Sequence, residues 1–88
     1  MTLPERLLDA VIDGDLGHGL IVTRQEVINH FRSDTETYTG VLLSNAEMTT
    51  GHHSPTYKKF TLRIDEGRYR IHPLALSARM QERGLLPP

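Results

Sequence analysis

The chain has 88 residues, of which 38% are hydrophobic and 24% charged, so its composition fits one folded domain rather than a disordered segment. It has no cysteine, which excludes disulfides, thiolate catalysis and the common zinc-finger patterns. No apolar run is long enough to cross a membrane, and the N-terminus lacks the pattern of a signal peptide, so we expect a cytoplasmic protein.

The net charge of −1 hides an asymmetry between the two halves of the chain. Residues 1–50 contain three basic and eight acidic residues, a balance of −5, whereas residues 51–88 contain seven basic and three acidic residues, a balance of +4. Such an asymmetry predicts one face for an anionic partner, although chance also produces lopsided charge in small domains.

Two capping boxes predict the first two helices. Thr2-Leu3-Pro4-Glu5 begins a helix over about residues 3–13. After a glycine-rich loop, Leu20-Ile21-Val22 is predicted to be a short, buried, extended segment. Thr23-Arg24-Gln25-Glu26 then begins a second helix, which we expect to end near Arg32.

The third element is ambiguous. The apolar residues between Tyr38 and Thr49 suit a helical face, and we favour one helix there. However, Tyr38, Thr39 and Gly40 are poor helix formers. The alternative is a strand-like segment over residues 37–43, followed by a short turn of helix that begins at Ser44.

The clearest strand pattern lies between Phe60 and His72. Apolar and polar residues alternate on both sides of Asp65-Glu66-Gly67, a three-residue turn with glycine last, and this predicts a β-hairpin. The alternation predicts two faces. The inward residues are expected to be Phe60, Leu62, Ile64, Tyr69 and Ile71, and the outward residues Thr61, Arg63, Arg68 and Arg70.

A last helix is predicted over about residues 73–83, because proline opens it and Gly84 follows it. Its inward residues are expected to be Leu74, Ala75, Ala78 and Met80. We expect residues 1–86 to form a single domain and residues 87–88 a tail.

The order helix, short strand, helix, helix, hairpin, helix resembles the winged helix-turn-helix superfamily over nearly the whole chain. The resemblance implies an α+β fold with a three-helix core, a two- or three-stranded antiparallel wing hairpin and a C-terminal helix. It also implies that Leu20–Val22 pairs with the hairpin. Residues 38–50 would then match the helix that lies in the major groove, and residues 60–72 the wing that contacts the DNA backbone or minor groove.

The residue types independently predict a nucleic-acid-binding surface, with double-stranded DNA as the expected partner. Long cationic side chains on one hairpin suit a row of phosphates, and short polar side chains can approach base edges. Against this, the third element contains Glu36 and Glu47 but no Lys or Arg, and alternating Arg and Thr also keeps a solvated strand soluble. The candidate contacts are Thr39, Ser44, Asn45, Thr49, Thr50, His52, His53, Lys58, Lys59, Arg63, Arg68 and Arg70.

We find no catalytic motif, and we expect neither an enzyme nor a cofactor. His52-His53 invites a metal-binding hypothesis, but adjacent residues rarely bind one ion and no cysteine supports them. A chain of this length is also expected to have little room for a substrate pocket.

Other partners remain open. The same surface suits a protein–protein interaction module or a small inhibitor, of the kind that a phage or mobile element encodes. A homodimer is a further alternative, with Leu85, Leu86 and the C-terminal helix as its surface. If His52, His53 or His72 touches phosphate, affinity for nucleic acid should rise at about pH 6.

Overall fold

Reciprocal caps begin the first two helices in the computed structural model, which describes residues 1–49 and 54–87. Helix α1 (Leu3–Ile12) follows Thr2, whose hydroxyl oxygen accepts from the Glu5 amide at 3.3 Å, while the Glu5 carboxylate accepts from the Thr2 amide at 3.0 Å. Thr23 and Glu26 cap α2 (Arg24–His30) in the same way. Both predicted helices are confirmed, each ending one or two residues earlier than expected.

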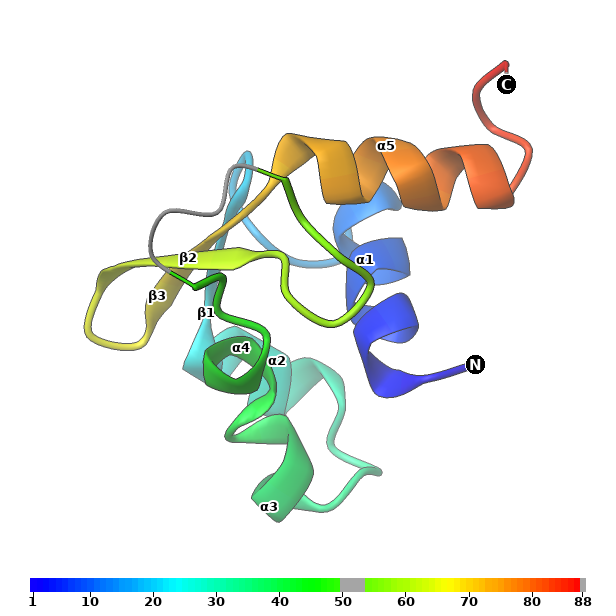
Figure 1. The fold of residues 1–88 in the computed structure, drawn as a ribbon. Helices are drawn as coiled ribbons and strands as arrows, with labels where there is room; N and C mark the ends of the chain where they lie inside the picture. The colour runs from blue at the N-terminus through cyan, green and yellow to red at the C-terminus, as the bar shows by residue number, and fades with distance from the viewer. Residues whose placement is uncertain (50–53, 88) are drawn as a thin grey trace.

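A three-stranded antiparallel sheet follows from the hairpin and one early strand (Figure 1). It consists of β1 (Ile21–Thr23), β2 (Thr61–Asp65) and β3 (Arg68–Ile71), in the order β1-β3-β2. The prediction that the early strand pairs with the hairpin is therefore confirmed. Gly67 has φ +69° in the turn, and its carbonyl accepts from the Arg24 amide at 2.8 Å, which joins the hairpin to the start of α2.

The predicted faces are correct for β3 and wrong for β2. Tyr69 and Ile71 are buried, but Thr61 is buried as well, whereas Leu62 and Ile64 are 38% and 48% exposed. The alternation breaks because the Phe60 and Thr61 amides both donate to the Ala46 carbonyl, which leaves two consecutive side chains in the core.

A second irregularity lies at the other end of β2. The pairing with β3 slips between Arg63 and Asp65, which leaves Ile64 as the extra residue of a β-bulge. Arg63 pairs opposite the buried Tyr69 and so lies on the core face of the sheet, not beside Arg68 and Arg70 as predicted.

The third element is neither the single helix nor the strand that the sequence suggested. It consists of two short helices, α3 (Glu36–Thr39) and α4 (Leu42–Asn45). In a continuous helix the Gly40 carbonyl would accept from an amide four residues later. Here it accepts from Arg24 Nε at 2.8 Å, and Val41 leaves helical geometry with φ −115° and ψ 1°.

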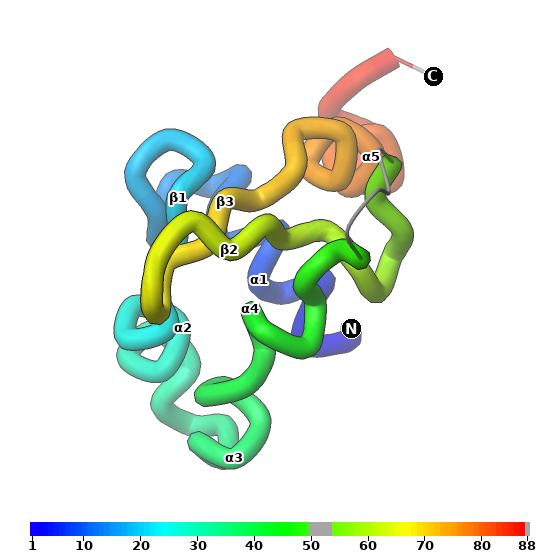
Figure 2. The backbone as a smooth tube through the Cα atoms, turned by 60° about the vertical axis from the view of Figure 1, so that its left-hand side comes forward, coloured from blue at the N-terminus to red at the C-terminus, as the bar shows by residue number. Residues whose placement is uncertain are grey.

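Helix α5 (Pro73–Glu82) closes the fold by packing across α1, so the first and last helices are in contact (Figures 1 and 2). Helices α2, α3 and α4 gather at another side of the sheet. The core between these elements contains the fully buried side chains Leu7, Val22, Val27, Phe60 and Ile71. The prediction of an inward Ala75 is confirmed, but Leu74 and Ala78 are exposed, because α5 turns its Ala75 and Arg79 side towards α1. Among the described residues, no helix has the length and apolar character to cross a membrane.

Candidate nucleic-acid interface

The basic residues of the chain divide into two groups. Three arginines form ion pairs: Arg6 with Asp34, and both Arg79 and Arg83 with acids of α1. The other seven form none with the residues that the structure describes: Arg24, Arg32, Lys58, Lys59, Arg63, Arg68 and Arg70. Part of the charge asymmetry between the two halves is therefore neutralised inside the fold, and the remaining positive charge concentrates on and beside the hairpin.

Arg68 and Arg70 form the centre of this positive surface. They alternate with the buried Tyr69 on the middle strand, so both project from the face of the sheet that points away from the core. Their Cα atoms are about 7 Å apart, as expected for residues separated by two positions in a strand. Thr23 and Asp65 lie opposite Arg68, and Ile21 and Leu62 opposite Arg70. The outer face of the sheet thus carries two arginines and one acid, Asp65, beside small apolar patches.

The two lysines lie before β2, in a loop held by Thr56. The Thr56 hydroxyl accepts from the Lys58 and Lys59 amides at 3.3 and 3.0 Å, and the Thr56 amide donates to the Lys59 carbonyl at 2.8 Å. Lys59 Nζ donates to the Asn45 carbonyl at 2.5 Å, and Lys58 Nζ lies 5.5 Å from the centre of the Tyr57 ring. Both lysines are exposed, and the loop ties them to α4.

The polar residues of the third element contribute less to this surface than the sequence suggested. Thr39 is 1% exposed, so the structure contradicts its assignment as a nucleic-acid contact. Ser44 is exposed, but its hydroxyl donates to the Val41 carbonyl at 3.1 Å. Asn45 and Thr49 have exposed side chains, and Thr50, His52 and His53 lie outside the described residues.

Arg24 is a cation that sequence reasoning missed. It begins α2, directly after the capping Thr23, and its backbone binds the hairpin turn at Gly67. Its side chain reaches the corner between α3 and α4 at Gly40. Arg24 and Arg68 line the same shallow hollow between α2 and the hairpin turn. Its place at the start of a capped helix was visible in the sequence, but its approach to the hairpin depends on tertiary pairing.

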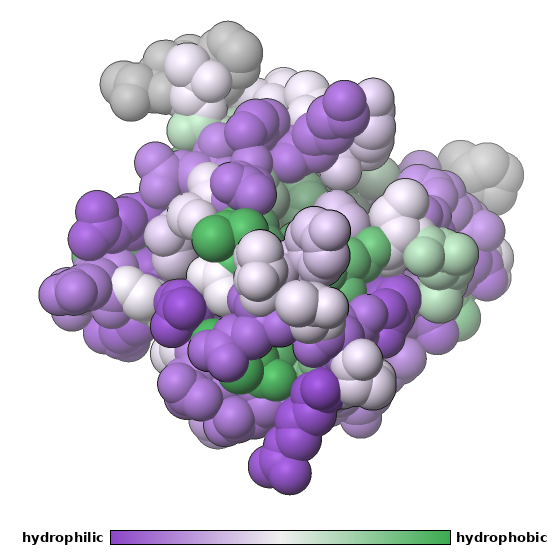
Figure 3. Space-filling model, turned by 90° about the horizontal axis from the view of Figure 1, so that it is seen from below, coloured by the Kyte–Doolittle hydropathy of each residue, from purple (hydrophilic) through white to green (hydrophobic). Residues whose placement is uncertain are grey.

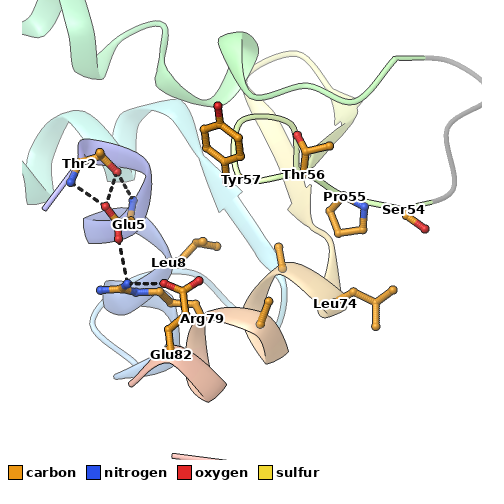
Figure 4. A pocket seen from close by; sticks show the side chains of 12 residues that line it. Thr2, Glu5, Leu8, Ser54, Pro55, Thr56, Tyr57, Leu74, Arg79 and Glu82 are labelled. Atoms are coloured by element: carbon orange, nitrogen blue, oxygen red, sulfur yellow. Dashed lines mark hydrogen bonds and ion pairs between the residues drawn. The ribbon is translucent and has the colours of Figure 1, made fainter. Parts of the chain in front are cut away.

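A groove on another part of the molecule was not expected for so short a chain. Its volume is about 490 Å³, and it lies between the loop over residues 54–57 and the helices α1 and α5 (Figure 4). Leu8 of α1 lines it, together with Leu74, Ala75 and Ala78 of α5. Tyr57 stands at its border and is 81% exposed.

Charged groups at the end of the groove form a connected cluster. Arg79, whose side chain is 11% exposed, donates to Asp9, Glu5 and Glu82 at 2.8 to 3.2 Å. The hydrogen bonds from Arg79 lower the pKa of the Asp9 carboxyl, and those from Thr2 lower the pKa of Glu5. The same carboxylates raise the pKa of Arg79. Arg79 and Arg83 meet four carboxylates here, those of Glu5, Asp9, Asp13 and Glu82, so the cluster has a net negative charge. Because these groups bind one another, we assign them to stability rather than to chemistry.

The surface seen from the side of α3 is mostly hydrophilic, with small apolar patches among the polar side chains (Figure 3). In the part of the chain that the structure describes, no three His, Asp or Glu side chains gather as metal ligands. Comparison of the chain with family models, with curated proteins and with solved structures gives no match.

Proposed function

We propose that this domain binds nucleic acid, double-stranded DNA first of all, through the outer face of its hairpin. The observation that carries the proposal is the division of the cations. Arg6, Arg79 and Arg83 are ion-paired, whereas the five cations in residues 58–72 are exposed and form no ion pair with any described residue. Of these five, Arg68 and Arg70 lie on the outer face, the two lysines lie in the loop before β2, and Arg63 lies on the other face of the sheet. Two acids, Asp65 and Glu66, lie in the same segment, so its balance is 5 − 2 = +3. Exposed cations of this kind bind phosphates and release counterions.

The topology supports a winged-helix interpretation of this surface. The order of the elements and the pairing of β1 with the hairpin agree with what the resemblance implies, and β2–β3 would be the wing. A long recognition helix is missing from the position where one was expected, because α3 and α4 have four residues each. We therefore propose binding that is led by the wing and depends little on base sequence.

The test is a titration of fluorescently labelled random-sequence duplex DNA, read by anisotropy at several salt concentrations. Wild-type affinity should fall steeply with salt, because each phosphate contact adds about 0.9 to the slope of log K against log salt. Arg68→Ala/Arg70→Ala should bind more weakly and have a slope smaller by about 1.8 if both side chains contact phosphate.

Arg32→Ala is the matched control. Arg32 is exposed and without an ion pair among the described residues, but it follows the C-terminal end of α2, whereas the hairpin turn binds the N-terminal end. It should leave the slope nearly unchanged. Equal losses in Arg32→Ala and in the hairpin variants would show that only net charge matters. No binding at about 50 mM salt would overturn the proposal, and the same surface would then be tested against protein partners.

A further inference from the structure

Tyr57 is the most exposed aromatic side chain among the described residues, at 81%, and it stands where cations and an apolar groove meet. Lys58 Nζ lies over one face of this ring, 5.5 Å from its centre, and the exposed remainder offers base-stacking area. Such stacking is a main source of affinity for single-stranded nucleic acid. Buried tyrosines cannot serve in this way, and Tyr69 is only 8% exposed.

The backbone beside the ring is held in place. Thr56 accepts from the amides of the two residues that follow Tyr57, and Lys59 anchors the loop to the Asn45 carbonyl. A stacking side chain on a fixed loop loses less conformational entropy on binding than one on a free loop. The ring therefore has a defined position before any ligand arrives.

The surroundings of the ring match the two parts of a nucleotide. Lys58 and Lys59 flank it with exposed cations that suit the phosphate. Leu8, Leu74 and Ala78 are apolar residues of the groove lining, which suits the flat face of a base. The groove volume of about 490 Å³ lies within the usual range for a small-molecule site, roughly 300–1,000 Å³.

The far end of the groove favours a particular kind of base. Glu82 is 62% exposed and binds Arg79 through Oε2, which leaves its other carboxylate oxygen available as an acceptor. Arg79 directs its donors to protein acceptors. An acceptor without a matching donor suits the amino groups of adenine, cytosine or guanine, and it repels phosphate, which fixes the phosphate on the lysine side.

We infer that Tyr57 stacks on an unpaired, amino-bearing nucleobase at this groove, so that the domain prefers nucleic acid with a single-stranded segment over a blunt duplex. This inference rests on the proposed function and adds a residue and a ligand class to it. A cationic, apolar peptide is the competing occupant of the groove, because the acidic end would also accept a lysine or arginine side chain.

The probe is a duplex with a short single-stranded tail that carries one 2-aminopurine, beside a blunt duplex of the same sequence. The tailed duplex should bind more tightly, and its 2-aminopurine fluorescence should be quenched by stacking. Tyr57→Ala should weaken binding of the tailed duplex between about fivefold and a hundredfold. Tyr57→Phe should keep both affinity and quenching, whereas Tyr57→Leu should lose the quenching because its side chain is not aromatic.

Tyr38→Ala is the matched control, because Tyr38 is 67% exposed on α3 with Glu36 rather than a lysine nearby in the sequence. It should bind the tailed duplex as the wild type does. If Tyr57→Ala kept wild-type affinity, the inference would be overturned. Salt-dependent binding of the blunt duplex would in that case still support the proposed function. Absence of binding to both probes would overturn both. Tyr57 is so exposed that thermal unfolding of its variants should match the wild type.

Discussion

Asp9 and Arg79, 70 positions apart in the sequence, form a two-point ion pair. Arg79 Nε lies 2.8 Å from Asp9 Oδ1, and its Nη2 lies 2.9 Å from Oδ2. This fork geometry fixes direction as well as distance, and it joins the first helix to the last. It also removes Arg79 from the set of cations that could meet a phosphate, although the sequence places it in the basic half of the chain.

Arg79→Ala should therefore destabilise the fold without weakening DNA binding. Removal of a cation that is 11% exposed leaves Asp9 with only the longer ion pair to Arg83, at 3.5 Å, and Glu5 with only its hydrogen bonds from Thr2. We expect a loss of about 2 kcal/mol in the free energy of unfolding, measured by urea denaturation. Arg32→Ala should change the free energy of unfolding by less than about 0.5 kcal/mol. Reduced affinity of folded Arg79→Ala for DNA would contradict this division of the cations.

Stability should fall in acid. The pKa of the Asp9 carboxyl is held below its usual value of 3.8, first by hydrogen bonds from Arg79, so the unfolded chain takes up a proton more readily than the folded one. The contribution of the ionised Asp9 carboxylate to stability is complete at pH values above its usual pKa. It is lost as the pH falls from there through the lower pKa of the folded state. Urea denaturation at descending pH should show this loss, and Asp9→Asn should show a smaller pH dependence because it has no carboxyl to protonate there.

Two buried threonines allow us to compare how a hydrogen-bonded hydroxyl and an unbonded one contribute to the free energy of unfolding. Thr61, at 0% exposure, donates to the Leu43 carbonyl at 2.8 Å, whereas Thr39, at 1% exposure, has a hydroxyl with no hydrogen-bond partner among the described residues. Thr61→Val should lower the free energy of unfolding by about 1–2 kcal/mol. Thr39→Val should be neutral or stabilising. Equal changes in thermal unfolding for the two variants would show that the hydrogen bond of Thr61 does not account for its contribution to stability.

Gly40→Ala should destabilise the corner between α3 and α4. Gly40 has an ordinary helical φ of −68°, so conformational freedom is not the reason for a glycine there. A Cβ would lie 2.8 Å from the Glu36 carbonyl oxygen and 2.8 Å from Arg24 Nη2. We expect a loss of about 1–3 kcal/mol in urea denaturation. Adding Arg24→Ala should not restore stability, because the contact with the Glu36 backbone remains; full recovery would place the whole effect on the arginine.

The parts of the fold that depend on residues close together in the sequence were predictable from the sequence. The capping boxes at Thr2 and Thr23 gave the starts of α1 and α2, and Gly67 gave the hairpin turn. The split of the third element was not, because it depends on Arg24 reaching the Gly40 carbonyl 16 positions away. The exposed Leu62 was missed for a similar reason, since the Ala46 carbonyl accepts from two successive amides before β2 and shifts its faces.

In the candidate site, too, features set by local sequence were predictable, and features set by tertiary contacts were not. Exposure of Arg68 and Arg70 followed from the alternation along β3, which the structure confirms. Thr39 was misassigned because its position three residues before the buried Leu42 was not taken into account, and that spacing also places it on the inward stripe of a continuous helix. The separation of Arg63 from its neighbours and the approach of Arg24 depend on pairing between strands and helices that local patterns do not encode. Tyr57 gave no signal beyond being an aromatic residue before two lysines.

The pairing of the first helix with the last also sets an order for folding during synthesis. Arg79 is made 70 residues after Asp9, which at ribosomal rates is a delay on the order of ten seconds. Throughout that interval the acidic side of α1 has no arginine to meet, and its apolar side lacks the cover of α5. Nascent chains are thus expected to reach native packing only after release of the final helix. The hairpin ends at Ile71, shortly before Arg79, so its synthesis is completed only on the order of one second earlier.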